Sequence, residues 1–212
     1  MSNIQYGLVS RVDSDTMEKC FDEIFEKFPN EPIKYTEVGI YHGRSVSGAR
    51  EYFKSKGKEY VQIGIDNFKD KEELVFFPED ATLIQGSSIE VYNQLPNESQ
   101  HFIMIDGNHS FPYVIADFFC YKNKVKIGGF ICFHDAAPHA QDVSYQRMGS
   151  KDDKDMYISV RRALKAIGLL ETTYTALEAD GTFLEQWELV FDEHAPFEVD
   201  EGGGVLIFKR VD

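Results

Sequence analysis

The chain has 212 residues, 42% of them hydrophobic, which is ample for one domain with a real core and short for two. Its formal net charge of −14 argues against a nucleic-acid partner, because nucleic-acid phosphates would be repelled. The sequence has neither a recognisable signal peptide nor an apolar run near the roughly 20 residues that span a bilayer, and its three cysteines lack the spacing of a zinc knuckle or a disulfide framework. These features predict one cytoplasmic domain over residues 1–212 that binds neither membranes nor nucleic acids.

Strand-like and helical segments alternate along the first two-thirds of the chain. The segment 13–28 has apolar residues at helical spacing, with Asp13 or Ser14 as its N-cap, and makes residues 1–30 an N-terminal helical region. Strands are expected at 34–40, 59–66, 81–86, 102–105 and 130–133, with helices between them at 45–56, 69–77, 88–95 and from Pro112 onward. This alternation indicates an α/β fold, a Rossmann-like and doubly wound, mostly parallel sheet with helices on both faces.

The pattern changes after Asp135. Residues 136–155 are polar without a clear period, and loops of this length in compact domains are commonly lids or binding loops. We expect this segment to be a lid that orders on ligand binding. A helix should follow over 156–168, and strand candidates at 172–180, 187–193 and 202–210 should add an antiparallel edge to the sheet.

The distinctive polar residues of this pattern follow the strands. In open parallel sheets, ligands bind outside the carboxyl ends of the strands. One crevice should therefore collect the residues at these ends, namely Glu37, Gly39, Asp66, Gly86, Asp106, His134 and Asp135.

The first strand-to-helix turn, "EVGIYHGRS", has two glycines that allow unusual dihedrals and close approach by a ligand. Its pattern is ExGxxxG rather than GxGxxG, and Tyr41 stands where the glycine that admits a pyrophosphate would be. Asp66 follows about twenty residues beyond the turn, a spacing that suits a carboxylate accepting from ribose hydroxyls. The turn therefore favours a nucleoside without a pyrophosphate, although a purely structural turn is the alternative.

Two neighbouring strands each end in a carboxylate and an imidazole. The first runs into Asp106 and His109, and the second into His134 and Asp135. A histidine can act as general base, and carboxylates with imidazole can bind a metal ion. The alternatives are a helix cap for Asp106, a solvated turn residue for His109, a satisfied core position for His134 and a turn role for Asp135. His101 is interpreted as a surface residue.

The stretches "EVGIYHGRS", "GIDNF", "LIQGSS", "IDGNHSFPYVIADF" and "KIGGFICFHD" resemble class I S-adenosylmethionine-dependent methyltransferases. The resemblance is strongest to the branch of macrolide-sugar O-methyltransferases and cephalosporin-hydroxylase-like proteins. It spans roughly Glu37 to Asp135, and outside that span it is only architectural. It implies a sheet of about seven strands in which the last strand is antiparallel.

The resemblance also implies roles for individual residues. Glu37, Gly39 and Gly43 would surround the methionine part of S-adenosylmethionine, and Ser45 would open the next helix. Asp66 would hold the ribose hydroxyls, and Gly86 and Ser87 would lie by the adenine. Asp106 would border the cofactor and bind a divalent ion, usually magnesium, with His134 and Asp135 completing the protein ligands. His109 would be the general base, with Asp106 beside it in the catalytic set.

This chain departs from the metal-dependent relatives at His134, where they carry a carboxylate. Magnesium prefers oxygen ligands, whereas imidazole suits Zn, Fe or Ni, so the identity of the ion stays open. The leading hypothesis is an O-methyltransferase, assisted by a divalent metal, that acts on a small hydroxylated molecule such as a sugar or natural product. An iron-dependent oxygenase or oxidoreductase and a non-catalytic nucleoside-binding protein are the alternatives. The sequence leaves the methyl acceptor and the oligomeric state open, a homo-oligomer included.

Overall fold

A computed structural model describes residues 9–67, 75–140, 144–145, 156–170, 186–196 and 203–212. The helices are α1 (Arg11–Lys27), α2 (Arg44–Ser55), α3 (Ser88–Val91), α4 (Phe111–Tyr121) and α5 (Val160–Ala166), with short 3-10 turns η2 (Tyr92–Gln94), η3 (Lys122–Lys124) and η4 (Pro138–Ala140). The strands are β1 (Ile33–Val38), β2 (Tyr60–Asp66), β3 (Thr82–Gln85), β4 (Gln100–Ile105), β5 (Val125–Phe133), β6 (Ser144–Tyr145), β7 (Met156–Tyr157), β8 (Trp187–Glu193) and β9 (Val205–Arg210).

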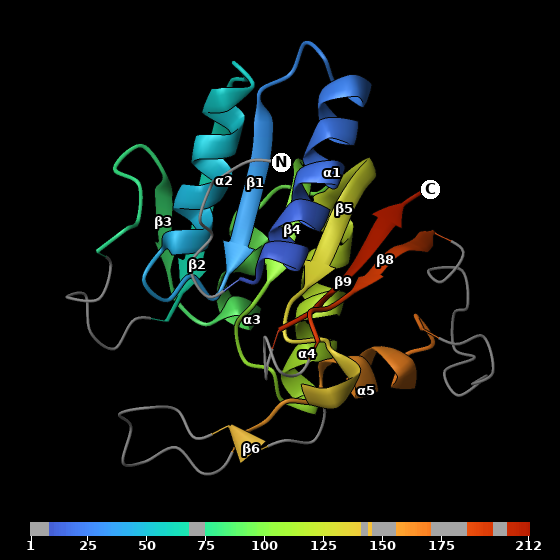
Figure 1. Cartoon of the computed structure of the whole chain (residues 1–212). Coiled ribbons are helices and arrows are strands. Elements are labelled where there is room, and N and C mark those ends of the chain that lie inside the picture. The colour runs from blue at the N-terminus through green and yellow to red at the C-terminus, as the bar shows by residue number, and fades with distance from the viewer. Residues whose placement is uncertain (1–8, 68–74, 141–143, 146–155, 171–185, 197–202) are drawn as a thin grey trace.

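The main sheet has seven strands in the order β3-β2-β1-β4-β5-β9-β8 (Figure 1). Strands β1 to β5 pair in parallel, while β9 runs antiparallel to both β5 and β8. The expected doubly wound sheet with an antiparallel last strand is therefore confirmed. Parallel pairing brings the carboxyl ends of β1, β2, β4 and β5 to the same edge of the sheet.

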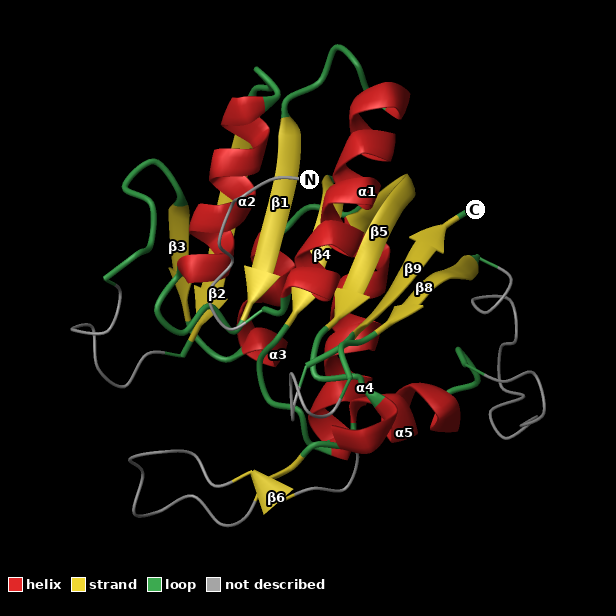
Figure 2. Ribbon diagram, in the orientation of Figure 1, coloured by secondary structure: helices red, strands yellow, loops and turns green. Residues whose placement is uncertain are grey.

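Helices cover both faces of the sheet (Figure 2). On one face, α1 and α2 pack over a cluster rich in aromatic side chains, in which Phe21 contacts Phe53 and Phe102 with ring centroids 4.9 Å apart in each pair. On the other face, α4 and α5 cover aliphatic residues of β4 and β5, with Phe118 at the centre of the contact. Each fully buried side chain of this size contributes roughly 1.5–3 kcal/mol to folding, so the two clusters fix the sheet between its helices.

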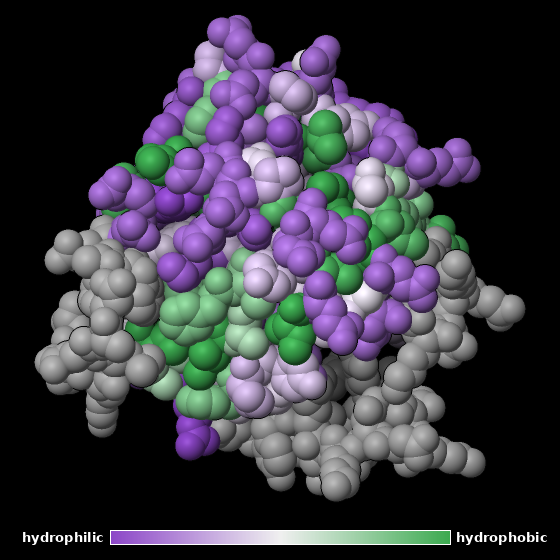
Figure 3. Space-filling model, turned by 180° about the vertical axis from the view of Figure 1, so that it is seen from behind, coloured by the Kyte–Doolittle hydropathy of each residue, from purple (hydrophilic) through white to green (hydrophobic). Residues whose placement is uncertain are grey.

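The face covered by α3 and α4 shows hydrophobic side chains between polar regions (Figure 3). Tyr113 and Phe119 of α4 are among its exposed large hydrophobic residues. None of the helices in the described ranges combines the length and the apolar composition of a membrane span.

Helix α1 begins earlier than its sequence pattern suggests. Ser10 is the N-cap, and its hydroxyl oxygen accepts the backbone N–H of Asp13 at 3.2 Å. Asp13 and Ser14, the expected caps, lie instead within the first turn of the helix and are buried. The cap assignment was wrong because Ser10 offers the same short oxygen side chain one turn upstream, where the backbone is still extended.

Several expected segments lie partly or wholly outside the described residues. These are the helix at 69–77, of which 75–77 are described, and the strand candidate at 172–180. The expected lid falls largely on residues 141–143 and 146–155, which are not described either, so the lid stays a prediction. Where the chain is described again, Met156–Tyr157 pairs with Ser144–Tyr145 as an antiparallel strand, and α5 begins only at Val160.

His101 is fully buried in β4, so its interpretation as a surface residue was wrong. Its Nδ1 accepts the backbone N–H of Lys34 at 3.0 Å, and the edge of its ring packs on Phe28 with centroids 4.6 Å apart. The side chain thus supplies an acceptor between β4 and β1, next to the first paired residues, Tyr35 and Phe102. Burial lowers the pKa of His101 to about 4, with the nearby Lys126 cation acting in the same direction.

This buried imidazole predicts a loss of stability in acid. Because the pKa of His101 is depressed on folding, its contribution is fully present above the ordinary value of 6.5 and is lost as pH falls towards 4. In His101→Asn, the amide oxygen can still accept the Lys34 N–H but does not titrate. Urea unfolding at pH 7 and pH 4 should show wild type losing up to about 3 kcal/mol more than the variant over this interval. Equal losses in both proteins would contradict the assignment.

Candidate active site at the carboxyl ends of the strands

Three alternate residues in the turn between β1 and α2 have a positive φ, namely Gly39 at 84°, Tyr41 at 45° and Gly43 at 79°. Gly39 also lies against β4, since a Cβ built on it would be 2.3 Å from the backbone oxygen of Asp106. Tyr41 is not a glycine and is held in the left-handed region, which costs about 1–2 kcal/mol in an L-residue. Strain of this kind persists where surrounding contacts over-determine the backbone, and it clusters at binding sites.

Asp66, at the end of β2, makes some of the contacts that fix the backbone of this turn. Its Oδ2 accepts the backbone N–H groups of Ile40 at 3.0 Å and Tyr41 at 3.1 Å, so the carboxylate braces the turn. The expected neighbourhood of the first turn and Asp66 is therefore present. A contact from Asp66 to ribose hydroxyls stays a prediction.

Glu37 lies at the end of β1 and is fully buried. Tyr35 donates its hydroxyl to Oε2 at 2.5 Å, and the Ser45 hydroxyl donates to Oε1. Burial raises the pKa of Glu37 to about 8, so the group is largely protonated at neutral pH. Glu37 and Ser45 thus tie β1 to the start of α2 beneath the turn, and a direct contact with a cofactor stays a prediction.

Gly86 and Ser87 follow β3. The backbone N–H of Gly86 donates to the carbonyl of Asp66 at 2.9 Å, which ties the end of β3 to the end of β2. Ser87 is the N-cap residue of α3, and a Cβ on Gly86 would meet Val91 of that helix at 2.4 Å. Both residues therefore lie at the same sheet edge as Asp66.

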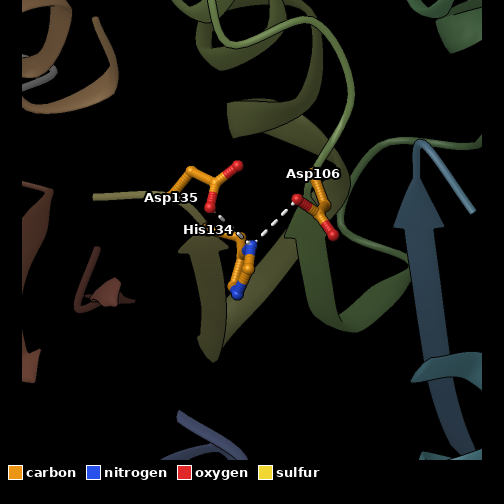
Figure 4. A group of neighbouring side chains, drawn as sticks. All are labelled: Asp106, His134 and Asp135. Atoms are coloured by element: carbon orange, nitrogen blue, oxygen red, sulfur yellow. Dashed lines mark hydrogen bonds and ion pairs between the residues drawn. The ribbon is translucent and has the colours of Figure 1, made fainter. Parts of the chain in front are cut away.

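The two strands that end in carboxylate and imidazole bring these groups together (Figure 4). Asp106 follows β4, and His134 and Asp135 follow β5. The Nδ1 atom of His134 lies 3.0 Å from Oδ1 of Asp106 and 3.5 Å from Oδ1 of Asp135. Asp135 has a φ of 53°, a left-handed conformation that Asp tolerates better than most residues, and the turn aims its carboxylate back towards the cluster.

His109 closes the cluster from the loop before α4. Its Nε2 lies 3.2 Å from Oδ1 of Asp106, and its Nδ1 lies 3.0 Å from Oδ2 of Asp135. Two imidazoles and two carboxylates therefore contact one another in a ring, which we call the Asp/His cluster: Asp106, His109, His134 and Asp135. The expected meeting of the two strand ends is borne out in these distances.

The electrostatics of the Asp/His cluster follow from this ring. Burial opposes the ionisation of Asp106, but His134 and His109 outweigh it and hold the pKa of the carboxyl well below its usual range. Burial likewise opposes protonation of both imidazoles, yet the pKa of His109 is raised, with Asp135 the leading cause. Asp106 and Asp135 raise the pKa of His134 further. In this arrangement each histidine favours the imidazolium form.

The donor set also fits a divalent ion. One ligand atom from each of Asp106, His134 and Asp135 lies within 4.8 Å of the others. The 3.0 Å between His134 Nδ1 and Asp106 Oδ1 is a separation that a hydrogen bond or a shared cation can bridge. An imidazole lone pair facing a carboxylate at that distance needs a cation between them, either a proton or a metal ion.

Asp13 belongs to this neighbourhood although the sequence pattern placed it at a helix cap. It is fully buried, its Oδ2 accepts the backbone N–H of Gly204 at 3.1 Å, and the same oxygen lies 3.6 Å from Nε2 of His134. A local sequence pattern carries no signal for this, because the contact depends on how α1 docks against the far end of the chain.

Residues 36–136 match the family model of a methyltransferase domain, and no curated protein sequence matches the chain. The solved O-methyltransferase NovP is 12% identical over 93% of this chain and 79% of its own, with a TM-score of 0.59. A Corynebacterium glutamicum protein is 12% identical over 96% of this chain and 84% of its own, with a TM-score of 0.58. MycE of the mycinamycin biosynthetic pathway, solved with Mg and SAH, is 15% identical over 90% of this chain, with a TM-score of 0.54. This chain spans only 48% of MycE. At such identities the likeness to solved structures establishes the fold.

Proposed function

We propose that this chain, whose residues 36–136 match a methyltransferase domain, is a class I S-adenosylmethionine-dependent enzyme that methylates a hydroxyl group of a small molecule, with the help of a divalent ion. The observation that carries the proposal is the Asp/His cluster, which lies at the carboxyl ends of β4 and β5, beside the glycine turn. A hydroxyl is a poor nucleophile until it loses its proton, and this cluster offers both a base and a place for a cation.

The cofactor would lie along the edge of the sheet formed by the first three strands and β4. The residues proposed to surround it are Glu37, Gly39, Gly43, Ser45, Asp66, Gly86, Ser87 and Asp106. Glycines allow close approach of the backbone, and the Asp66 carboxylate suits the two ribose hydroxyls. Glu37 and Ser45 would hold the turn in place through the buried hydrogen bond between them.

When bound, S-adenosylmethionine supplies an electrophilic methyl group, and a divalent ion at Asp106, His134 and Asp135 supplies positive charge that acidifies the hydroxyl. The residues of the chain would position the acceptor hydroxyl and take up its proton. His109 is the proposed base, and it takes the hydroxyl proton on one ring nitrogen while a carboxylate of the cluster orients the other. An imidazolium that contacts both carboxylates is not a base, so His109 must first release the proton of one ring nitrogen to solvent, and with it the contact that this proton makes.

Isothermal titration calorimetry with four ligands tests this proposal against its alternatives. S-adenosylmethionine and S-adenosylhomocysteine should bind, whereas NAD and 2-oxoglutarate should not. Binding of 2-oxoglutarate would favour an iron-dependent oxygenase, and binding of NAD a dehydrogenase. Binding of S-adenosylhomocysteine without turnover on any of a panel of sugars and phenols would favour a non-catalytic nucleoside-binding protein.

Asp66→Ala should weaken S-adenosylhomocysteine binding roughly 10- to 100-fold, as expected for one charge-assisted hydrogen bond worth about 1.5–3 kcal/mol. Because Asp66 also braces the turn at Ile40 and Tyr41, Asp66→Asn is the matched variant. Its amide oxygen can keep the brace while the charge towards ribose is lost. Calorimetry should then rank wild type above Asn and Asn above Ala. Unchanged affinity in a folded alanine variant would remove Asp66 from the cofactor site.

A further inference from the structure

Asp13 is a buried carboxylate to which the described residues offer few polar partners. It is 0% exposed on the first turn of α1, and its Oδ1 has no hydrogen-bond partner among the described residues. Moving an ionised carboxylate from water into a protein interior costs several kcal/mol unless a partner compensates. Apart from the Gly204 N–H, the polar group facing it is the imidazole of His134, at 3.6 Å.

His134 is placed between two sets of carboxylates. Its Nδ1 faces Asp106 and Asp135, and its Nε2 faces Asp13 on the opposite side of the ring. The side chain is 94% buried, and Nε2 has no hydrogen-bond partner among the described residues. A separation of 3.6 Å is too long for a hydrogen bond, and a shift of about 0.6 Å would close it. The unpartnered Nε2 of His134 thus faces Oδ2 of Asp13, which accepts the Gly204 N–H, while Oδ1 of the same buried carboxylate has no partner among the described residues.

This arrangement matches a general rule for metal-binding histidines. A ligating imidazole almost always donates its other ring N–H to a carboxylate, carbonyl or water, which fixes both its tautomer and its orientation. With the proton on Nε2, towards Asp13, the lone pair of His134 lies on Nδ1, towards the carboxylates of Asp106 and Asp135.

We propose that Asp13 is a positioning residue that holds His134 through its Nε2–H, so that Nδ1 serves as a metal ligand. The site then has two carboxylate oxygens and one imidazole nitrogen, and it prefers a transition-metal ion that accepts imidazole, Zn²⁺ ahead of Mn²⁺, to Mg²⁺. The inference rests on the divalent-ion site of the proposed function, and adds to it the residue that orients the nitrogen ligand and the class of ion that the site selects.

Calorimetric titration of the metal-free chain with MnCl2, ZnCl2 and MgCl2 tests the inference directly. Wild type should bind Mn²⁺ or Zn²⁺ at least 10-fold more tightly than Mg²⁺. Asp13→Asn keeps an acceptor for the Nε2–H but removes its charge, so it should weaken Mn²⁺ and Zn²⁺ binding about 10-fold, the lower end of the effect of losing such an outer partner, and change Mg²⁺ binding much less. The matched control is Asp22→Asn, which removes a carboxylate of the same helix that pairs with Lys56 at the surface. It should leave all three affinities unchanged.

A spectroscopic readout separates positioning from a merely structural role. Pulsed EPR of the Mn²⁺-loaded chain should show ¹⁴N coupling from an imidazole ligand, lost in His134→Ala and weakened in Asp13→Asn. If Asp13→Asn does not fold, ¹H–¹⁵N NMR of the Zn²⁺-loaded wild type decides instead, and should find His134 protonated at Nε2 and metal-bound at Nδ1.

The outcomes separate this inference from the proposed function. Equal metal affinities in wild type and Asp13→Asn, or metal bound at Nε2, would overturn the role of Asp13 while leaving the site in place. A clear preference for Mg²⁺ would overturn the inferred selectivity. If wild type binds none of the three ions, the inference falls together with the metal site. S-adenosylhomocysteine binding in the same samples would show whether the methyltransferase proposal stands without the metal.

Discussion

Asp106→Asn is expected to lower kcat/KM for methyl transfer roughly 10²- to 10³-fold or more, with a smaller loss, below about 10-fold, in S-adenosylhomocysteine affinity. Oδ1 of Asp106 contacts both histidines of the Asp/His cluster, at 3.0 Å from His134 and 3.2 Å from His109. The amide keeps the shape of the side chain but removes the charge that a metal ion requires. The loss should therefore fall mainly on the reaction, although Asp106 also borders the proposed cofactor site.

The measurement is initial-rate kinetics with a hydroxylated acceptor found by screening, in buffer with saturating Mn²⁺ or Mg²⁺. Asp80→Asn is a suitable control, because it removes an exposed carboxylate that pairs with Arg50 far from the cluster. Thermal unfolding of both variants shows whether they are folded. If the folded Asp106→Asn protein retains more than about a third of the wild-type rate, the Asp/His cluster is not the reaction centre.

Much of the candidate site could be predicted because parallel topology is readable from the sequence. Once strands and helices alternate, the carboxyl ends of the parallel strands share one edge, and Asp106 and Asp135 meet there because β4 and β5 are neighbours in the sheet. No side-chain detail was needed for that step. The distances within the cluster then depend on the in-register pairing of β4 with β5 near their ends, where Ile105 lies beside Phe133.

The residues that sequence reasoning misplaced have tertiary contacts that local patterns do not encode. Asp is a residue type that commonly caps helices, and only the docking of α1 shows that Asp13 faces His134. His101 opens a continuous apolar run in a central strand, and such runs do not reveal which polar residue is buried with them. Its place between β4 and β1 depends on the adjacent Lys34 N–H.

The second large effect is expected for substitution of Gly39, where the first turn closely approaches the end of β4. At Gly39, a φ of 84° disfavours any side chain, and a Cβ would lie 2.3 Å from the Asp106 oxygen and 2.5 Å from the Gly107 Cα. These are backbone atoms of the neighbouring strand end, so no side-chain rotation relieves the clash. Gly39→Ala should therefore push apart the turn that is proposed to receive the cofactor and the strand end that carries Asp106.

We expect Gly39→Ala to lower the free energy of unfolding by about 3 kcal/mol, from positive-φ strain together with overpacking. S-adenosylhomocysteine affinity should fall at least 10-fold because the turn moves. Gly57→Ala is the matched control, since Gly57 also has a positive φ, at 64°, but a Cβ there would meet nothing within 4 Å. It should cost only the strain, about 1 kcal/mol, and leave affinity unchanged.

In a protein of this size, 1 kcal/mol corresponds to roughly 2–4 °C in Tm. Calorimetric Tm values should therefore drop about 6–12 °C for Gly39→Ala and about 2–4 °C for Gly57→Ala. Equal losses in the two variants would mean that the contact between the turn and β4 does not hold the site together.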